Sequence, residues 1–394
     1  MSGPDAAGTS LLPGTGTNGQ QTTLGVMGGG QLGRMFVQAA QRMGYFTAVL
    51  DPDVASPAGL ISHYHIRSDY SDQQGLAQLI ARCAAITTEF ENVPAPALLS
   101  LGAQRHVAPG ADAVAVAQDR ALEKRHFAWC GVPVAAWTLI ETRAQLDGAS
   151  DELFPGILKT CRLGYDGKGQ VRVADRGALA PAWAELGGGR CVLEKQLALA
   201  AECSVIVARG ADGVCVNYPV QSNLHRNGIL AVTSVYDGNI PSELAAQAIA
   251  ATKLVAEKLQ YVGVLCVEFF VLEDGSLVVN EMAPRPHNSG HYSIDACDVS
   301  QFELQVRALA GLPLTQPRQH SAALMLNLLG DLWEPRAPDF AQVLALPGAH
   351  LHLYGKLQAR VGRKMGHLTL TAPGAGELLE SAHTAAKLLG IAAF

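Results

Sequence analysis

The sequence predicts a mixed fold: a parallel α/β domain, then an α+β region of antiparallel hairpins, and a small C-terminal domain. Strand-like and helical segments alternate in the first part of the chain, which is typical of a parallel sheet. Further along, short apolar runs are separated by Asp-Gly and Asn-Gly pairs, which favour hairpin turns of two residues. A chain of 394 residues is long enough for two or three domains.

Composition and charge exclude several classes of protein. Hydrophobic residues make up 48% of the chain and charged residues 16%, which is too apolar for a largely disordered protein. No apolar run is long enough to cross a bilayer, so we expect no membrane contact. The formal net charge of −6 argues against nucleic-acid binding, which requires a basic surface.

The cysteines and the N-terminal segment indicate the compartment. The eight cysteines form no C-x-x-C pair, so we expect buried, reduced thiols. Residues 1–22 are rich in Gly, Thr, Ser and Pro and lack the basic start and long apolar run of a signal peptide. We interpret them as a flexible tail and predict a cytoplasmic protein.

The N-terminal domain is expected over residues 23–118. Its elements alternate as strand 24–27, a helix ending at Gly44, strand 46–50, a helix near 71–83 and a strand near 85–90. This order predicts a parallel sheet. A connecting helix near 118–131 leads into the next domain.

The turn after the first strand has the spacing Gly-x-Gly-x-x-Gly at residues 28–33, and Asp51 ends the next strand. Glycines at this place let the backbone approach a phosphate at a helix N-terminus, as in Rossmann-like dinucleotide-binding domains. The same spacing also suits a tight turn that needs glycine for steric reasons alone. The motif therefore leaves a nicotinamide-dependent oxidoreductase open.

From Phe154 onward the pattern changes to antiparallel hairpins, with turn signals at 166–167, 212–213, 227–228 and 274–275. A helix is expected near 242–259. We place a central domain at 119–310, with a lid at roughly 154–220, and a C-terminal domain at 311–394.

The hairpin over 266–283 places two carboxylates opposite each other. If Asp274 and Gly275 form a two-residue turn, Glu268 lies directly opposite Glu281. A shared proton or a hard divalent cation must offset the repulsion, and mostly apolar neighbours favour magnesium over a solvated edge. We expect Glu281→Gln to keep or raise the stability of the metal-free chain and to destroy the magnesium site.

A second hairpin tip, residues 164–170, holds three glycines and Lys168 after the strand that carries Lys159. Exposed backbone N–H groups and a lysine suit a loop that covers phosphates, although an ordinary glycine-rich turn has the same composition. Glu194 and Glu202 flank the next segment. They could contact an adenine amino group and ribose hydroxyls, or they could be surface acids.

The C-terminal domain contains a basic cluster. Between 341 and 376 there is no Asp or Glu, yet Lys356, Arg360, Arg363 and Lys364 all occur. Interleaved glycines favour tight turns that bring these side chains together, so a pocket for one phosphate monoester is expected in preference to a solvated face or a nucleic-acid patch.

Two histidine pairs and one cysteine are interpreted as structural. His63 with His65, and His350 with His352, each share a strand face, but no carboxylate lies close to either pair in the sequence. Cys161 has no histidine near it in the sequence, so we expect a packed thiol.

Residues 280–291 read Asn-Glu-Met-Ala-Pro-Arg-Pro-His-Asn-Ser-Gly-His, a highly specific run. With residues 28–35, 164–170 and 354–367, this run makes the chain resemble the 5-(carboxyamino)imidazole ribonucleotide synthases, a family of ATP-grasp ligases of purine biosynthesis. The resemblance covers Leu24 to about Gly390. It implies an ATP-grasp fold in which the nucleotide lies between two α+β lobes, with ATP and magnesium as cofactors and often a homodimer.

The resemblance also implies where the ligands bind. Positions that match the family's ATP-binding residues are Arg120, Lys159, Gly164, Tyr165, Asp166, Gly167, Lys168, Gly169, Gln170, Glu194, Lys195, Gln196, Leu197, Glu202, His225, Asn280 and Glu281. Positions expected around the ribonucleotide are Gln31, Leu32, Glu89, Tyr165, Asp166, His287, Lys356, Arg363 and Lys364. Glu268 and Glu281 match the magnesium ligands. Ala283 stands where many relatives have a metal-binding Asn, so water or phosphate oxygens must complete the metal shell.

The implied reaction joins bicarbonate to the exocyclic amine of aminoimidazole ribonucleotide, with ATP converted to ADP and phosphate through carboxyphosphate. Arg285 would steady the transferring phosphoryl group, because a planar guanidinium matches its oxygens. His287 and Asp166 are both candidates for orienting or deprotonating the amine. The rivals are another ATP-grasp enzyme, of the formate-dependent glycinamide ribonucleotide transformylase or biotin carboxylase type, and the nicotinamide-dependent oxidoreductase.

Overall fold

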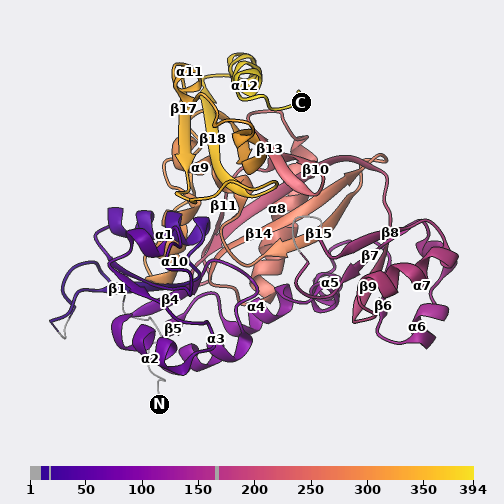
Figure 1. Ribbon diagram of the computed structural model, residues 1–394, viewed down its shortest axis with the longest axis horizontal. Helices are drawn as coiled ribbons and strands as arrows, with labels where there is room; N and C mark the ends of the chain where they lie inside the picture. The colour runs from indigo at the N-terminus through magenta and orange to yellow at the C-terminus, as the bar shows by residue number, and fades with distance from the viewer. Residues whose placement is uncertain (1–9, 17–18, 165–167) are drawn as a thin grey trace.

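The computed structural model describes residues 10–16, 19–164 and 168–394. Three sheets organise the chain: a parallel sheet at the N-terminus, a small antiparallel sheet, and a large antiparallel sheet that the C-terminal strands extend. In Figure 1 the small sheet projects to one side of the other two. No helix in the described ranges is long and apolar enough to cross a membrane.

The N-terminal domain is the predicted alternation of strands and helices around a parallel sheet of order β3-β2-β1-β4-β5. Its elements are β1 (Thr23–Met27), α1 (Gln31–Arg42), β2 (Phe46–Leu50), η1 (Gly59–Ile61), β3 (Tyr64–Ile66), α2 (Gln73–Arg82), β4 (Ala85–Thr88), α3 (Ala95–Gly102), β5 (His106–Val107) and α4 (Ala111–Ala117). Helix α1 is amphipathic, and Met35, Phe36 and Ala40 on its apolar face are buried.

Part of the predicted flexible tail is packed in the structure. The Leu11 N–H donates to the Ala310 carbonyl at 2.8 Å, and the Leu11 carbonyl accepts from the Tyr45 hydroxyl at 2.6 Å. Ser10 donates its hydroxyl to the Gly311 carbonyl at 2.7 Å. Residues 10 and 11 therefore connect the N-terminal domain to the helix that ends at Leu309.

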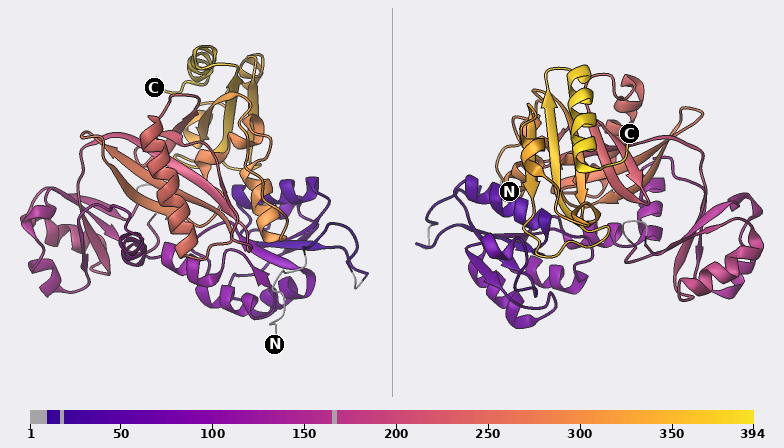
Figure 2. Two further views of the ribbon diagram at one scale, coloured as in Figure 1. Left: turned by 180° about the vertical axis from the view of Figure 1, so that it is seen from behind. Right: turned by 45° about the horizontal axis from the view of Figure 1, so that its top comes forward.

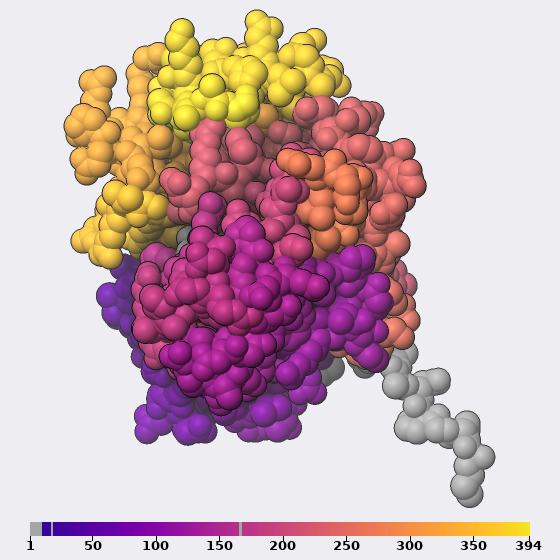
Figure 3. Space-filling model, turned by 90° about the vertical axis from the view of Figure 1, so that its right-hand side faces the viewer, coloured from indigo at the N-terminus to yellow at the C-terminus, as the bar shows by residue number. Residues whose placement is uncertain are grey.

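The small sheet has the order β6-β9-β7-β8 and is antiparallel. Its strands and the helices around it are α5 (Arg120–Trp129), β6 (Trp137–Ile140), α6 (Arg143–Asp147), η2 (Asp151–Leu153), β7 (Gly156–Thr160), β8 (Gln170–Val173), α7 (Arg176–Glu185) and β9 (Cys191–Lys195). Figure 3 views the molecule from the side on which this unit projects, with the C-terminal domain above it.

The large sheet has nine strands in the order β15-β14-β10-β12-β13-β16-β18-β17, and β11 pairs with β10. Its strands are β10 (Leu199–Arg209), β11 (Cys215–Asn217), β12 (Gln221–Arg226), β13 (Ile229–Val235), β14 (Gly263–Leu272), β15 (Leu277–Ala283), β16 (Ala322–Leu329), β17 (Ala349–Leu353) and β18 (Lys364–Ala372). Because β16 pairs with β13, the C-terminal strands continue the central sheet and bring the basic cluster to its edge.

The remaining helices cover the large sheet. They are α8 (Ser242–Lys258), η3 (Asn288–Gly290), α9 (Ser293–Ala296), α10 (Gln301–Leu309), η4 (Gly330–Trp333), α11 (Phe340–Leu344) and α12 (Ala375–Leu389). Figure 2 shows α8 across one face of the sheet, and α12 packs against β16 and β18. One core cluster joins α8 to the inner strands through Val255, Leu265 and Val267.

The predicted turns differ in how they are built. Asn227 and Gly228 form a two-residue turn between Arg226 and Ile229, and both have positive φ, which confirms the hairpin signal. The pair at 212–213 lies in a longer loop, and the pair at 166–167 lies outside the described residues.

The prediction of a two-residue turn at Asp274-Gly275 is wrong. Leu272 and Ser276 are bonded across a three-residue loop, and Gly275 has a φ of 82°, which is typical of a turn closed by a left-handed residue. A β-bulge at Asn280 then shifts the register by one residue, so Glu268 still lies directly opposite Glu281. The predicted juxtaposition of the two carboxylates is therefore confirmed.

Candidate active site

A cleft of about 1120 Å³ lies where the three sheets meet. Its walls come from the glycine turn at 28–33, the small sheet, strands β14 and β15, and the loop at 356–364. This size exceeds that of a pocket for one drug-sized ligand, so the cleft can hold more than one small molecule.

Glu268 and Glu281 lie side by side at the floor of the cleft, but their surroundings differ. Glu281 forms an ion pair with Arg120 at 2.9 Å, and Arg120 and Lys159 lower the pKa of Glu281 to about 2 although burial opposes its ionisation. Glu268 is 9% exposed, and burial, followed by the charge of Glu281, raises its pKa to about 7. Glu268 Oε1 is buried and has no hydrogen-bond partner among the described residues.

A second acidic group lies behind this floor. The Glu194 carboxylate forms ion pairs with the ammonium groups of Lys159 at 3.1 Å and Lys124 at 3.2 Å. All three side chains are buried. Burial lowers the pKa of Lys159, in opposition to the charge of Glu194. Glu194 is therefore a buried ion-pair partner, and the surface-acid alternative is wrong for it.

Glu202 pairs with His225 across β10 and β12 at one wall of the cleft. The His225 Nδ1 lies 2.7 Å from Glu202 Oε2. Burial disfavours the charged ring, but the carboxylates of Glu202 and Glu268 together raise the pKa of His225. This wall can thus offer a cation and a carboxylate to a polar ligand.

The loop after β15 brings Arg285 and His287 into the cleft. Arg285 donates its Nε–H to Glu91 at 2.7 Å, and Glu91 raises the pKa of Arg285 against the effect of burial. Burial and the charge of Arg285 lower the pKa of His287 well below its usual value. The Ser289 N–H donates to His287 Nδ1 at 3.3 Å, so the neutral ring carries its proton on Nε2, which lies 3.5 Å from Glu268 Oε1.

The glycine turn is occupied by the chain's own carboxylates. Glu89 accepts the N–H of Gly30 at 2.5 Å and that of Gly33 at 2.7 Å. Asp51 accepts the N–H of Gly29 at 2.6 Å. The backbone donors that would bind a dinucleotide phosphate are therefore already used, which argues against the nicotinamide-dependent oxidoreductase.

The basic cluster faces the same cleft from the C-terminal side. Lys356 donates to Gln31 Oε1 and to the Lys364 carbonyl, both at 2.7 Å, and so links the C-terminal domain to the start of α1. Arg363 donates to the Gln358 carbonyl at 2.8 Å. Lys356, Arg363 and Lys364 all line the cleft, as a phosphate pocket requires.

Three family models match successive parts of the chain: a ribonucleotide synthetase preATP-grasp domain at 21–118, an ATP-grasp domain at 125–302, and a phosphoribosylaminoimidazole carboxylase C-terminal domain at 323–381. A curated protein from Brucella melitensis named N5-carboxyaminoimidazole ribonucleotide synthase is 43% identical over 372 residues, which are 93% of this chain and 98% of that protein. This chain belongs to the N5-carboxyaminoimidazole ribonucleotide synthase family.

Solved structures agree with this assignment. The N5-carboxyaminoimidazole synthetase of Staphylococcus aureus, complexed with ADP, is 36% identical and has a TM-score of 0.88, with 97% of this chain and 100% of that chain covered. The synthase of Aspergillus clavatus, in complex with ADP and 5-aminoimidazole ribonucleotide, is 31% identical and has a TM-score of 0.85, with 94% and 98% covered. The predicted ATP-grasp fold of this N5-carboxyaminoimidazole ribonucleotide synthase family member is thereby confirmed.

Most of the site residues expected from the sequence meet in the cleft. Those that line it are Gln31, Leu32, Glu89, Arg120, Lys159, Gly164, Lys168, Gln170, Glu202, His225, Glu268, Asn280, Glu281, Arg285, His287, Lys356, Arg363 and Lys364. Gly169 and residues 194–197 are not among the lining residues. Tyr165, Asp166 and Gly167 lie outside the described residues.

Sequence reasoning missed three residues of this synthase family member. Glu123 is buried, accepts the Met282 N–H at 2.7 Å, and has a pKa that burial and Glu281 raise to about 8. Glu91 and Gln118 also line the cleft. Glu123 is one turn after Arg120 on α5, a spacing that could have placed it on the same helix face.

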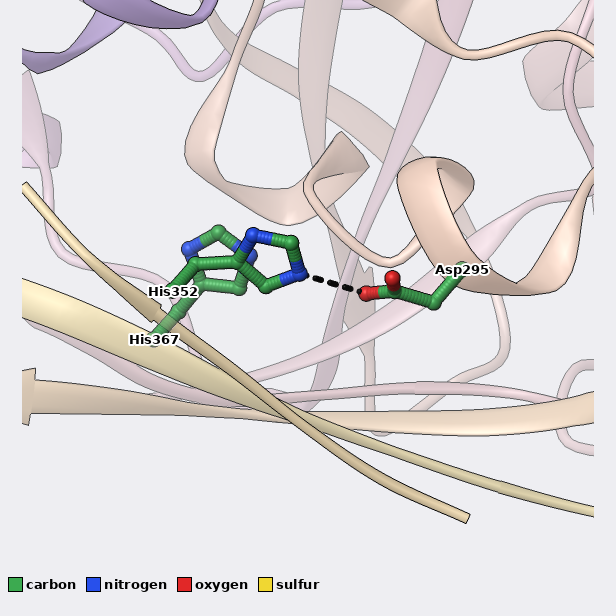
Figure 4. Close-up of side chains that lie close together, drawn as sticks. All are labelled: Asp295, His352 and His367. Carbon is green, nitrogen blue, oxygen red and sulfur yellow. Dashed lines mark hydrogen bonds and ion pairs between the residues drawn. The ribbon is translucent and has the colours of Figure 1, made fainter.

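The histidine pair at 350 and 352 has a carboxylate neighbour that the sequence did not reveal. His352 lies 2.9 Å from Asp295 of α9, and its ring stacks on that of His367 at 4.5 Å and 11° (Figure 4). His367 is bonded to the Tyr354 hydroxyl at 2.9 Å. Because the in-plane lone pairs of parallel rings do not converge on one point, this arrangement is a hydrogen-bonded stack, in agreement with a structural role.

Cys161 is buried, and burial raises the pKa of its thiol to about 11, as expected for a packed thiol.

Proposed function

We propose that this protein uses ATP to join bicarbonate to the exocyclic amine of 5-aminoimidazole ribonucleotide, giving N5-carboxyaminoimidazole ribonucleotide, ADP and phosphate. The observation that carries the proposal is one cleft that combines a carboxylate pair, buried cations, and a basic phosphate pocket. Membership of the synthase family supports it, and so do the relatives that contain ADP and the ribonucleotide.

The nucleotide is proposed to lie between the small sheet and the large sheet. Lys159 and Arg120 would contact its phosphates, Lys168 would cover them, and Glu202 with His225 would contact the ribose. Glu194 would act through Lys159, because its carboxylate already holds that ammonium group at 3.1 Å.

Glu268 and Glu281 fit a magnesium ion. Within residues 10–16, 19–164 and 168–394, the buried Glu268 Oε1 has no hydrogen-bond partner, and oxygen donors are the ligands that this cation prefers. When bound, the ion would neutralise charge on the phosphates. Ala283 offers no third side-chain ligand next to the pair.

Arg285 and His287 are proposed to serve the reacting groups. Arg285, held at Nε by Glu91, can direct its remaining N–H groups to bicarbonate and to the transferring phosphoryl group. Bicarbonate oxygen forms a bond to the γ-phosphorus while ADP leaves, and the amine then displaces phosphate from the resulting carboxyphosphate. His287 carries its proton on Nε2 and would donate a hydrogen bond to a substrate oxygen, which makes it an orienting group. Asp166 stays the other candidate for moving the amine proton.

The ribonucleotide would lie between the N-terminal and C-terminal domains. Its phosphate would meet Lys356, Arg363 and Lys364, and its ribose or amine would meet Glu89 beside Gln31 and Leu32.

The test is ADP release with and without aminoimidazole ribonucleotide and bicarbonate. We expect release that needs both substrates and magnesium. ADP release that needs formate or biotin instead would support the related ATP-grasp enzymes, and a spectral change on titration with NADH would support the oxidoreductase.

We also infer a homodimer and a cytoplasmic location. All eight cysteines are free in the structure, which fits a reducing compartment. Light scattering coupled to size-exclusion chromatography tests the dimer, and a single mass near 41.4 kDa would contradict it.

A further inference from the structure

Gln118 lies at the junction between α4 and α5, and all of its side-chain hydrogen bonds cross between structural units. It is 5% exposed. Its Nε2 donates to the carbonyls of Glu91 at 2.5 Å and Val93 at 2.7 Å, both in the loop after β4. Its Oε1 accepts from Arg162 Nη2 at 2.7 Å, at the end of β7. One amide therefore joins the N-terminal domain to the small sheet. In Figure 1, α4 and α5 lie between these two units.

The first half of this connection leads to Arg285. The loop whose carbonyls Gln118 holds also carries the Glu91 carboxylate, and this carboxylate accepts Arg285 Nε at 2.7 Å. A shift of the loop would move the carboxylate and with it the guanidinium. Gln118 is thus linked to Arg285 through the loop that carries Glu91.

The second half leads to the loop expected to cover the phosphates. Arg162 directly precedes Leu163 and Gly164, and Gly164 and Lys168 line the cleft. Arg162 therefore moves with the small sheet when that sheet shifts relative to the rest of the site.

The two residues after Gln118 make parallel connections. Asp119 pairs with Arg190 of the small sheet, and the Arg120 N–H donates to the Cys161 carbonyl at 2.9 Å. Arg120 also reaches Glu281. Of these three consecutive residues, Gln118 is the one that joins the small sheet to the loop carrying Glu91.

We propose that Gln118 is a positioning residue that fixes the small sheet and Arg285 relative to each other. The ATP phosphates are thereby aligned with the bicarbonate site. The proposal rests on the proposed function. An amide side chain supplies both donors and an acceptor, and neither Glu nor Leu of similar size does so. Transfer between two bound reactants is sensitive to such alignment, since a displacement of about 1 Å can cost on the order of 100-fold in rate.

The variants Gln118→Leu, Gln118→Glu, Arg162→Gln and Arg162→Lys test the proposal. For each, kcat and the KM values for ATP and ribonucleotide are measured, together with ADP release without ribonucleotide. Arg143→Gln is the control, because Arg143 is an exposed arginine of the same unit whose ion pair with Asp147 lies outside the cleft. Thermal melts verify that each variant is folded.

We expect Gln118→Leu to lower kcat roughly 10- to 100-fold with less than about a threefold change in the KM for ATP. Gln118→Glu keeps the acceptor for Arg162 but loses both donors, so its kcat should fall similarly. Arg162→Gln should raise ADP release without ribonucleotide relative to release with it, and Arg162→Lys should recover part of the coupling. The double variant Gln118→Leu with Arg162→Gln should have a kcat no lower than that of Gln118→Leu, because both substitutions disrupt the same Gln118–Arg162 hydrogen bond.

A folded Gln118→Leu variant with a kcat within twofold of wild type would overturn the proposal, and so would multiplying effects in the double variant. Arg162 is exposed, so its variants keep the test valid if Gln118→Leu does not fold. Absence of ribonucleotide-dependent ADP release in the wild type would instead overturn the proposed function, before any variant is compared.

Discussion

Glu281 forms an ion pair with Arg120 at 2.9 Å, whereas Glu268, directly opposite on β14, has a buried oxygen without a hydrogen-bond partner in the part of the chain that the structure describes. The two carboxylates are thus unequal without metal. The charge on Glu281 is stabilised, and the charge on Glu268 is not.

This inequality changes the expectation for substitutions at the pair. Glu281→Gln would leave Arg120 without its partner and should destabilise the metal-free protein by about 1–3 kcal/mol, contrary to the expectation from the sequence. Glu268→Gln should keep or raise the Tm of the metal-free protein, because it removes the unfavourable charge. Both should abolish nearly all ATP turnover. Thermal melts in EDTA and ADP release in magnesium check this, and equal Tm shifts in both variants would contradict it.

The pH dependence of stability without metal should reflect Glu268 together with Glu123. Burial raises the pKa of Glu268 from 4.5 to about 7 and that of Glu123 to about 8, so the folded state holds protons that the unfolded state releases. The stability of the metal-free protein should therefore fall as pH rises from about 4.5 to about 7. Urea unfolding across this range should show the slope, and Glu268→Gln should reduce it while the contribution of Glu123 stays. An unchanged slope in the variant would place the titrating group elsewhere.

Gly30 tests the role of the glycine turn. A methyl group at Gly30 would lie 2.5 Å from Glu89 Oε1, so Gly30→Ala must displace that carboxylate. We expect the KM for the ribonucleotide to rise about 10-fold, which corresponds to ~1.4 kcal/mol, with the KM for ATP nearly unchanged. Gly110→Ala is the matched control, since Gly110 also precedes a helix and has open space around it. A higher KM for ATP in Gly30→Ala would move the glycine turn to the nucleotide site.

Arg363→Ala tests the phosphate pocket. Loss of one charge-assisted hydrogen bond, worth ~1.5–3 kcal/mol, should raise the KM for the ribonucleotide by about 10-fold or more and leave the KM for ATP nearly unchanged. Steady-state kinetics with each substrate varied in turn measure both values. Arg318→Ala is the control, because its side chain is 84% exposed and pairs with Asp298 outside the cleft. Weaker ATP binding with unchanged ribonucleotide binding would assign the basic cluster to the nucleotide.

Trypsin cleavage after Lys168 tests the phosphate-covering loop. Leu163 is 72% exposed and Lys168 is exposed, so the protein without ligands should be cut there. ATP with magnesium should protect this bond. Equal cleavage rates with and without ATP would count against contact between Lys168 and the phosphates.

Glu268 and Glu281 lie opposite each other as predicted from the sequence, but the turn that connects their strands differs from the predicted one. The two-residue turn assumed at Asp274 is replaced by a three-residue loop, and the bulge at Asn280 compensates for the difference. Turn chemistry is local and visible in Asp274-Gly275, but a bulge depends on how the partner strand is held. Alternation of side chains alone could not reveal it.

The contacts that the sequence did not predict join distant segments. Arg120 and Glu281 are separated by 161 residues, and His352 and Asp295 by 57. The parallel sheet and the Asn227-Gly228 hairpin were predictable because their signals are local. Gln118 and Glu91 carry no motif, and their side chains find partners only where distant segments meet: Gln118 with Arg162 beside the small sheet, and Glu91 with Arg285 in the loop after β15.

The Glu89 carboxylate at the start of α1 reverses the hydrogen-bond polarity of that site. A helix N-terminus after a glycine turn normally presents donors and attracts phosphate. Here two of those donors are taken, and what faces the cleft is a pair of acceptor oxygens. A ligand at this turn must therefore bring hydroxyl or amino hydrogens, and its phosphate must go elsewhere. The N-terminal domain thus keeps the backbone of a phosphate-binding turn, but the groups that this turn presents to the cleft are hydrogen-bond acceptors.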